Sequence, residues 1–152
     1  MDNAAIARAL SDIADLLEIK GENAFKIRAY RSAADVVQTS GEPVAGMTDA
    51  QLRALPGIGK DLSARIRELA DTGTCAPYRE LMAAFPATIL DLLRLQGVGP
   101  KTVALLYHSL GVDSVEALSA AAQAGRLRTL KGMGPKKESL ILKAIDDRTR
   151  TA

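Results

Sequence analysis

The sequence is poor in the residues that build disulfides, metal clusters and aromatic cores. Cys75 is its only cysteine and His108 its only histidine, so no disulfide can form within the chain and no clustered Cys/His metal site can be assembled. Aromatic residues make up 3% of the chain and tryptophan is absent, while Ala, Leu and Arg are abundant. This composition favours helix over sheet.

Long apolar runs are also missing. No stretch approaches the roughly 20 residues that a membrane-spanning helix needs, and the start of the chain lacks the basic-then-apolar plan of a signal peptide. We therefore expect a cytoplasmic protein with no membrane partner. The length of 152 residues allows one compact domain or two small ones in series.

The formal net charge of +2 conceals an uneven distribution. Residues 1–24 carry five acidic and two basic side chains, whereas residues 126–150 carry eight basic and three acidic ones. A chain polarised in this way can hold a polyanion locally without being basic overall. Charge taken alone favours the simpler interpretation of a solvated helix face.

Apolar residues recur at intervals of three and four, which is typical of amphipathic helices. The first such stripe predicts a helix over residues 3–20, ended by Gly21, and consists of Ile6, Leu10, Ile13 and Leu17. Asn23 can cap a second helix, and Thr48 with Gln51 has the spacing of a capping box. Further helices are expected around residues 77–84, 87–95, 101–110, 114–124 and 135–147. No segment shows the alternation of a strand.

One short pattern occurs three times between predicted helices. The copies are Leu55-Pro56-Gly57-Ile58-Gly59-Lys60, Leu95-Gln96-Gly97-Val98-Gly99-Pro100-Lys101, and Leu130-Lys131-Gly132-Met133-Gly134-Pro135-Lys136. Their first glycines lie 40 and 35 residues apart. An apolar residue follows each second glycine within four to seven positions, namely Ile66, Leu106 and Ile141. Such repetition predicts three copies of one unit, in which a tight glycine turn joins two helices.

The repeated pattern suits phosphate binding. Glycine permits a positive φ and has no Cβ, so the chain can turn sharply and a phosphate oxygen can approach the amides. Pro100 and Pro135 suit the first position of a helix, and the free amides at a helix N-terminus attract anions. Nearby lysines add attraction from the side, namely Lys60, Lys101, Lys136 and Lys137. None of these groups contacts a base edge, so we expect binding with little sequence preference.

A purely structural helical turn is the competing interpretation, because such turns also use glycine. A single copy would be weak evidence, and the third copy has the less typical beginning Lys131-Gly132-Met133. Three copies in register favour phosphate binding. A Rossmann turn or a P-loop does not fit, since each requires a preceding strand.

With these motifs, the chain resembles the N-terminal region of bacterial family X DNA polymerases, the repair polymerases related to polymerase beta. The resemblance covers nearly the whole chain and rests on the helix 3–20, the run 19–31, the hairpin 55–60 and residues 125–130. It implies an all-α fold of tandem helix-hairpin-helix units, SAM-like and similar to the polymerase beta N-terminal domain. We expect domains at 1–80 and 81–152, joined near Ala76-Pro77. The resemblance implies that the catalytic palm of the family follows the third hairpin, so we expect no palm within these residues.

The hairpins and the resemblance together give a set of expected DNA-binding residues. In the hairpins these are Gly57, Ile58, Gly59, Lys60, Gly97, Val98, Gly99, Lys101, Thr102, Gly132, Gly134, Lys136 and Lys137. In the phosphate pocket of the family they are Lys26, Tyr30 and Arg31, although Tyr30 also falls on an apolar stripe and fits a core residue. The resemblance further implies a Na⁺ or K⁺ ion on the backbone carbonyls of Leu55, Ile58, Leu95 and Val98.

The small domain of the family can also cleave an abasic deoxyribose phosphate through a lysine that forms a Schiff base. Arg65 holds that position here, and arginine does not lose its proton at accessible pH. Three further positions depart from the family pattern, namely Ala64, Asp61 and Phe25. We therefore predict no catalytic residue and expect a monomer that binds gapped or nicked DNA in repair, associated with the nucleoid. A lyase and a helical protein-interaction module are the alternatives.

Overall fold

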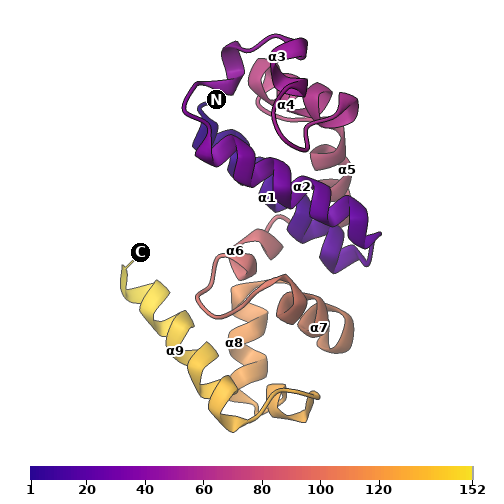
Figure 1. Cartoon of the computed structure of the whole chain (residues 1–152). Helices are drawn as coiled ribbons and strands as arrows, with labels where there is room; N and C mark the ends of the chain where they lie inside the picture. Colours follow the sequence, from indigo (N-terminus) through magenta and orange to yellow (C-terminus); the bar gives the residue numbers. More distant parts are fainter. Residues whose placement is uncertain (152) are drawn as a thin grey trace. The chain divides into compact units, whose positions relative to one another are not determined.

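The computed structural model describes residues 1–151, and this part of the chain consists of helices and turns without a strand (Figure 1). The expected all-α fold is confirmed. The chain divides into two compact units, Met1–Ala84 and a second that begins at Phe85. Among the residues described, no helix is both long enough and apolar enough to cross a bilayer.

The first unit is built on a pair of long helices. Its elements are α1 (Asn3–Lys20), α2 (Ala24–Thr39), the 3-10 turn η1 (Val44–Gly46), α3 (Asp49–Arg53), α4 (Lys60–Thr72) and α5 (Ala76–Ala84). The helix α1 packs along α2 and also contacts α4 and α5. Its predicted apolar stripe forms the core, since Ile6, Leu10 and Ile13 are fully buried. Burial of each such side chain stabilises the unit by about 1.5–3 kcal/mol.

Local signals in the sequence set the ends of these helices. Gly21 ends α1 in the left-handed region, at φ 86°. The side chain of Asn23 accepts a hydrogen bond from the amide of Phe25 at 2.7 Å and so caps α2. Thr48 and Gln51 form both hydrogen bonds of the predicted capping box at the start of α3, which is therefore confirmed.

The single cysteine lies in the core of the first unit. Cys75 directly precedes α5, is fully buried and forms no disulfide. Burial raises the pKa of its thiol, because a thiolate is costly away from water. Its role in the structure is that of a small apolar side chain.

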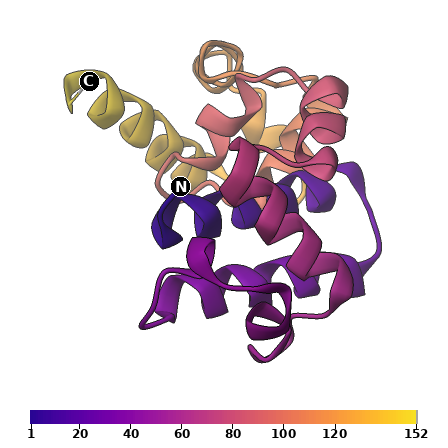
Figure 2. The same cartoon turned by 90° about the horizontal axis from the view of Figure 1, so that it is seen from above.

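The second unit is a bundle of shorter helices that ends in a long one. Its elements are α6 (Ile89–Leu93), α7 (Pro100–Leu110), α8 (Val115–Gln123), the 3-10 turn η2 (Leu127–Thr129) and α9 (Pro135–Thr151). The helices α8 and α9 contact each other. They are orange and yellow in Figure 1, and Figure 2 shows the yellow α9 from above. The fully buried side chains of this unit include Ile89, Leu92, Leu106 and Leu118.

Two helices differ from their expected lengths by several residues. The helix expected over 87–95 is restricted to Ile89–Leu93, because the residues just before it form i→i+3 turn hydrogen bonds, from Ile89 to Pro86 and from Leu90 to Ala87. The last helix runs to Thr151 and so exceeds the expected end at residue 147.

The division between the two units falls after α5. The boundary expected at residue 80 lies inside this helix. Because α5 packs on α1, the whole helix belongs to the first compact unit, and the expected joint at Ala76-Pro77 is its first turn.

Candidate nucleic-acid interface

The three repeated segments adopt the same turn, and we call them hairpin 1 (residues 55–60), hairpin 2 (95–101) and hairpin 3 (130–136). In each hairpin the first glycine has a positive φ, at 75° in Gly57, 80° in Gly97 and 81° in Gly132. In each, the residue between the glycines donates its amide hydrogen bond across the turn, at 3.2, 3.2 and 3.0 Å, to the carbonyl oxygens of Leu55, Leu95 and Leu130. The internal repetition seen in the sequence is therefore a repetition of backbone geometry.

The apolar residue between the two glycines anchors each hairpin in its own unit. The exposed fractions of these three side chains are 4%, 3% and 6% for Ile58, Val98 and Met133. Ile58 and Val98 were expected among the DNA-binding residues. Their side chains face the protein interior, so only their backbone atoms can reach a ligand.

The second glycine of each hairpin is not required by the fold. Gly59 and Gly99 both have φ −94°, with extended ψ values, a conformation that residues with side chains also adopt. A Cβ at either glycine, or at Gly134, would have no heavy atom within 4 Å beyond its chain neighbours. An open backbone face at three equivalent places is consistent with the close approach of an external partner.

Free amides lie next to these open faces. Gly59 and Gly99 are the N-cap residues of α4 and α7, and they offer no side chain to cap the helix. After each second glycine, the first amide that donates a main-chain hydrogen bond is that of Ser63, Val103 or Glu138. The amides that lie between the glycine and this residue have no main-chain acceptor within the helix. They form the positive end of the helix dipole.

Exposed cations surround the amides. Lys60, Lys101, Lys136 and Lys137 are all exposed, and Thr102 is half-buried. The lysines lie within the first turn of α4, α7 and α9, where their charge adds to that of the helix terminus. The hairpins thus combine main-chain donors with ammonium groups, a combination that suits a phosphate.

A buried residue behind each hairpin escaped the sequence analysis. The fourth residue after the second glycine is almost fully enclosed in all three copies, namely Ser63, Val103 and Glu138. Ser63 donates a hydrogen bond of 2.6 Å to the carboxylate of Asp49, which joins α4 to α3 behind hairpin 1. The constant spacing between this buried position and the second glycine is the sequence signal that could have identified it.

Hairpin 3 has an ionic contact at this position. Arg128 donates to the Glu138 carboxylate from Nη2 at 2.7 Å, from Nε at 3.2 Å and from its backbone amide at 3.2 Å. These side-chain hydrogen bonds from Arg128 lower the pKa of Glu138, although burial acts in the opposite direction. The contact holds η2 against the start of α9.

A separate hollow in the first unit contains two of the expected phosphate contacts. It measures about 420 Å³, and its lining includes Lys26, Tyr30, Asp61 and Arg65. Lys26 is exposed, whereas Tyr30 is 6% exposed, and burial raises the pKa of its hydroxyl. The position of Tyr30 therefore agrees with its interpretation as a core residue.

Arg31 does not face this hollow as a free cation. Its guanidinium donates to Asp15 at 2.7 Å and to Glu18 at 3.3 Å, so it joins α2 to α1. Burial raises the pKa of Asp15, and Arg31 partly offsets that effect. Because its charge is neutralised within the unit, we leave Arg31 out of the interface proposed below.

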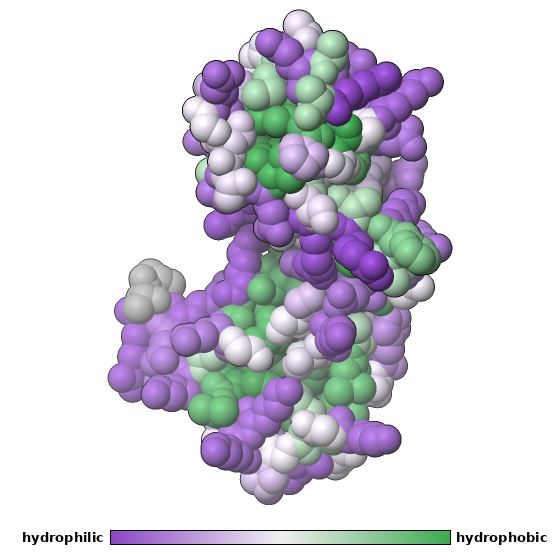
Figure 3. Space-filling view, in the orientation of Figure 1, coloured by the Kyte–Doolittle hydropathy of each residue, from purple (hydrophilic) through white to green (hydrophobic). Residues whose placement is uncertain are grey.

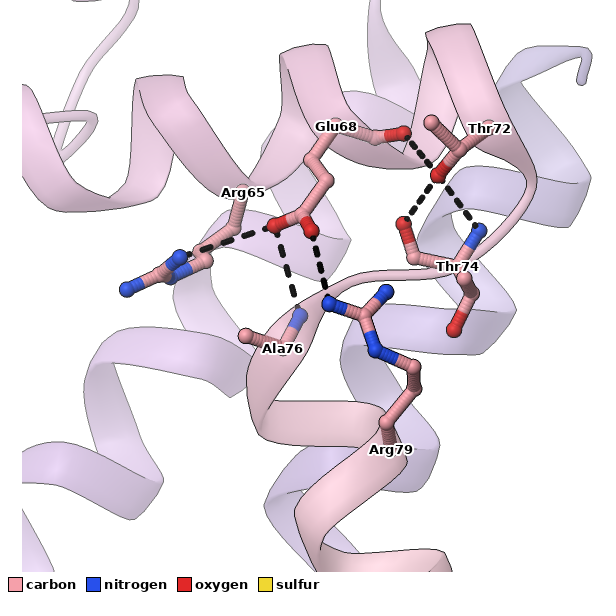
Figure 4. Close-up of polar contacts among 6 residues, drawn as sticks. All are labelled: Arg65, Glu68, Thr72, Thr74, Ala76 and Arg79. Atoms are coloured by element: carbon pink, nitrogen blue, oxygen red, sulfur yellow. Dashed lines mark hydrogen bonds and ion pairs between the residues drawn. The ribbon is translucent and has the colours of Figure 1, made fainter.

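Arg65 is also engaged by an acidic side chain (Figure 4). Its Nη1 lies 3.5 Å from the carboxylate of Glu68. Glu68 further accepts from the Ala76 amide at 3.3 Å and from Arg79 at 3.2 Å. Burial acts to raise the pKa of Glu68, but these hydrogen bonds and charges together lower it. This cluster joins α4 to α5.

The hairpin carbonyls fit the expected monovalent cation in part. The Leu55 and Leu95 oxygens each accept one turn hydrogen bond and keep a second lone pair. The Ile58 and Val98 oxygens precede the helical ladders of α4 and α7. In the part of the chain that the structure describes, no group of three or more His, Cys, Asp or Glu side chains is placed to hold a metal ion.

Comparison with known families assigns both units. Residues 1–75 match the helix-hairpin-helix domain, and residues 89–147 match the SAM-like helix-hairpin-helix tandem. This chain is a helix-hairpin-helix protein. The matches place hairpin 1 in the single helix-hairpin-helix domain, and hairpins 2 and 3 in the tandem.

The helix-hairpin-helix chain is also similar to the DNA polymerase/3'-5' exonuclease PolX of Bacillus subtilis (strain 168). The two are 36% identical over 142 residues, which are 93% of this chain and 25% of the relative. The similarity lies in the N-terminal part of that family X polymerase, as the sequence indicated. The chain thus spans about a quarter of the length of this relative.

Proposed function

We propose that this chain binds DNA through its sugar-phosphate backbone, as the N-terminal DNA-binding part of a family X polymerase or as a stand-alone relative that acts in repair in the cytoplasm. The observation that carries the proposal is the open backbone face at Gly59, Gly99 and Gly134. None of these positions has the positive φ that would make the fold itself require glycine. Free amides and exposed lysines border each of these faces.

The groups at the hairpins favour binding without sequence preference. Main-chain amides and ammonium groups recognise phosphate oxygens, which are the same at every nucleotide. The proposal therefore predicts affinities that vary little with base sequence and fall steeply with salt.

Selectivity for gapped or nicked DNA is the finer part of the proposal. The hairpins belong to two units with separate cores, so each unit can hold its own segment of duplex. An interruption in one strand makes DNA easier to bend between two such segments. A Na⁺ or K⁺ ion on the carbonyls of Leu55 and Ile58, and of Leu95 and Val98, would supply further positive charge beside the phosphates.

The residues that line the hollow of the first unit argue against lyase activity. Arg65 occupies the position at which the family resemblance places a nucleophilic lysine, and its guanidinium lies beside Glu68. A guanidinium that keeps its proton cannot form a Schiff base. We therefore propose binding of a phosphate, and no covalent chemistry, in this hollow.

The test replaces the second glycines and leaves the first ones intact. A variant with Gly59→Ala, Gly99→Ala and Gly134→Ala should bind a fluorescent gapped duplex at least about tenfold more weakly, because each methyl group keeps a phosphate from amides whose hydrogen bonds contribute roughly 0.5–1.5 kcal/mol each. Fluorescence anisotropy measures the affinity, and circular dichroism measures the helical content.

A matched control is available in the same chain. Gly41 and Gly46 also have no positive φ and no atom near a Cβ, but they lie outside the hairpins. The double variant Gly41→Ala, Gly46→Ala should bind DNA as the native chain does. Native affinity in the folded hairpin variant would refute the proposal, and affinity that ignores salt would favour a protein-interaction module.

A further inference from the structure

Hairpins 2 and 3 share a hollow on the surface of the second unit. It measures about 360 Å³, and its lining comprises Gln96 and Gly97 from hairpin 2 together with residues of hairpin 3 and α9 that include Gly134, Lys136, Leu140 and Ile141. This volume lies within the range of small-ligand clefts, about 300–1,000 Å³. Figure 3 shows hydrophobic surface on this unit bordered by hydrophilic residues.

The wall of the hollow is mostly apolar, although its rim carries positive charge. The side chain of Leu140 is 58% exposed, and it is one of three large hydrophobic residues classed as exposed among those described. Ile141 beside it is 2% exposed and continues into the core. Lys136 and Lys137, both exposed, belong to the lining. Neither the family matches nor the hairpin motif assigns a role to Leu140.

We propose that this hollow holds one unpaired nucleobase of a DNA strand whose phosphates are bound by hairpins 2 and 3. The inference rests on the proposed function and names a further contact of the same interface. Charge complementarity selects the occupant, because the lysines and helix-start amides attract an anion while the wall around Leu140 attracts apolar surface. A nucleotide presents both chemistries within one unit, a phosphate and the flat face of a base.

The occupant is an unpaired base because only such a base has a free face. In a continuous duplex both faces of each base are stacked on neighbours, and a paired base must be unstacked before it can enter a pocket. A base in a gap or bulge has already lost part of that stability. The wall offers few polar groups, so the hollow should accept any of the four bases and recognise the absence of pairing.

The experiment compares three DNA molecules of otherwise identical sequence. The first is a continuous duplex, the second carries one extra unpaired adenosine in one strand, and the third carries an abasic residue at the same place. Both bulged molecules bend easily, so their difference isolates the base. The native chain should bind the adenosine bulge about fivefold more tightly than the abasic bulge, as expected for partial burial of apolar surface.

The variant Leu140→Ala tests the wall of the hollow. Its preference for the adenosine bulge over the abasic bulge should fall to near unity, while its affinity for the continuous duplex stays native. Alanine favours helix and Leu140 is exposed, so the variant should fold, which circular dichroism can verify. Ser139→Ala is the control, since Ser139 is an exposed neighbour on α9 that does not line the hollow.

Each alternative outcome overturns a different statement. Equal binding of the two bulges by the native chain would show that bending alone is recognised, and a preference that survives in Leu140→Ala would place the base elsewhere. Either result refutes the hollow as a base site but leaves backbone binding intact. Native duplex affinity in the variant with three second glycines replaced would instead refute the proposed function itself.

Discussion

The two glycines of a hairpin look equivalent in the sequence but are needed for different reasons. Gly57 has a φ of 75°, where a side chain is strained, whereas Gly59 has a φ of −94° and faces open space. The first glycine therefore serves folding, and we assign the second to binding. The sequence predicts the turn but cannot separate the two roles, because the φ of each glycine depends on the backbone hydrogen bond that closes the turn.

Single substitutions should separate stability from affinity. Gly57→Ala should lower the free energy of unfolding of the first unit by about 1–2 kcal/mol, the cost of left-handed backbone for a residue with a Cβ. Gly59→Ala should change it by less than about 0.5 kcal/mol and weaken DNA binding instead. Urea unfolding followed by circular dichroism measures the first effect. Equal destabilisation by both changes would contradict this assignment.

Individual polar residues were the hardest part to predict from the sequence. Arg31 was expected to contact phosphate because the family resemblance places it in the phosphate pocket, yet the packing of α1 against α2 brings Asp15 and Glu18 to it. Glu138 belongs to the basic C-terminal segment and is nonetheless buried. The partner of each residue comes from another element, and periodicity within one helix contains no information about that pairing.

At the scale of elements, the sequence was informative because the signals are local. The stripe of α1, the cap of α2 and the capping box of α3 each depend on residues within a few positions of one another. The three hairpins were found by self-similarity for the same reason. The buried contact behind each hairpin differs, because Ser63 donates to Asp49 behind hairpin 1, whereas the buried carboxylate of Glu138 accepts from Arg128 behind hairpin 3.

The carboxylate behind hairpin 3 should give the second unit a distinctive pH dependence. Because Arg128 lowers the pKa of Glu138, the contribution of this pair to stability is complete above the usual carboxyl pKa and is lost as the pH falls through the lowered value. Glu138→Gln should lower the thermal midpoint at neutral pH, and its deficit relative to the native chain should shrink under acid conditions.

An exposed glutamate provides the control for this titration. Glu116 lies in the first turn of α8, is exposed and pairs with no arginine among the residues that the structure describes, so Glu116→Gln should lower the midpoint much less than Glu138→Gln does, by no more than the loss of a carboxylate at a helix N-terminus. Thermal unfolding by circular dichroism, repeated from neutral to strongly acidic buffer, gives both curves. A deficit in Glu138→Gln that does not vary with pH would mean that the carboxylate charge plays no part.

At the scale of the whole molecule, the two units have separate cores, and each carries at least one hairpin. We expect residues 1–84 and residues 85–152 to fold when produced separately. Each fragment should bind duplex DNA more weakly than the whole chain, because linkage of two binding modules raises the effective concentration of the second site.

The salt dependence of binding should reveal how the phosphate contacts are shared. Each neutralised phosphate adds roughly 0.9 to the slope of log affinity against log salt on duplex DNA, so the slopes of the two fragments should sum to about that of the whole chain. Anisotropy titrations at several salt concentrations measure all three. A fragment whose affinity does not respond to salt would remove its hairpins from the interface.

The enclosed position of Cys75 gives the chain an internal reporter. A thiol reagent cannot reach this fully buried sulfur until the first unit opens, and the second unit contributes no cysteine to the signal. The rate of labelling at low denaturant should therefore follow the opening of one half of the native protein. Saturating DNA should slow that labelling if hairpin 1 takes part in binding, whereas an unchanged rate would exclude the first unit from the complex.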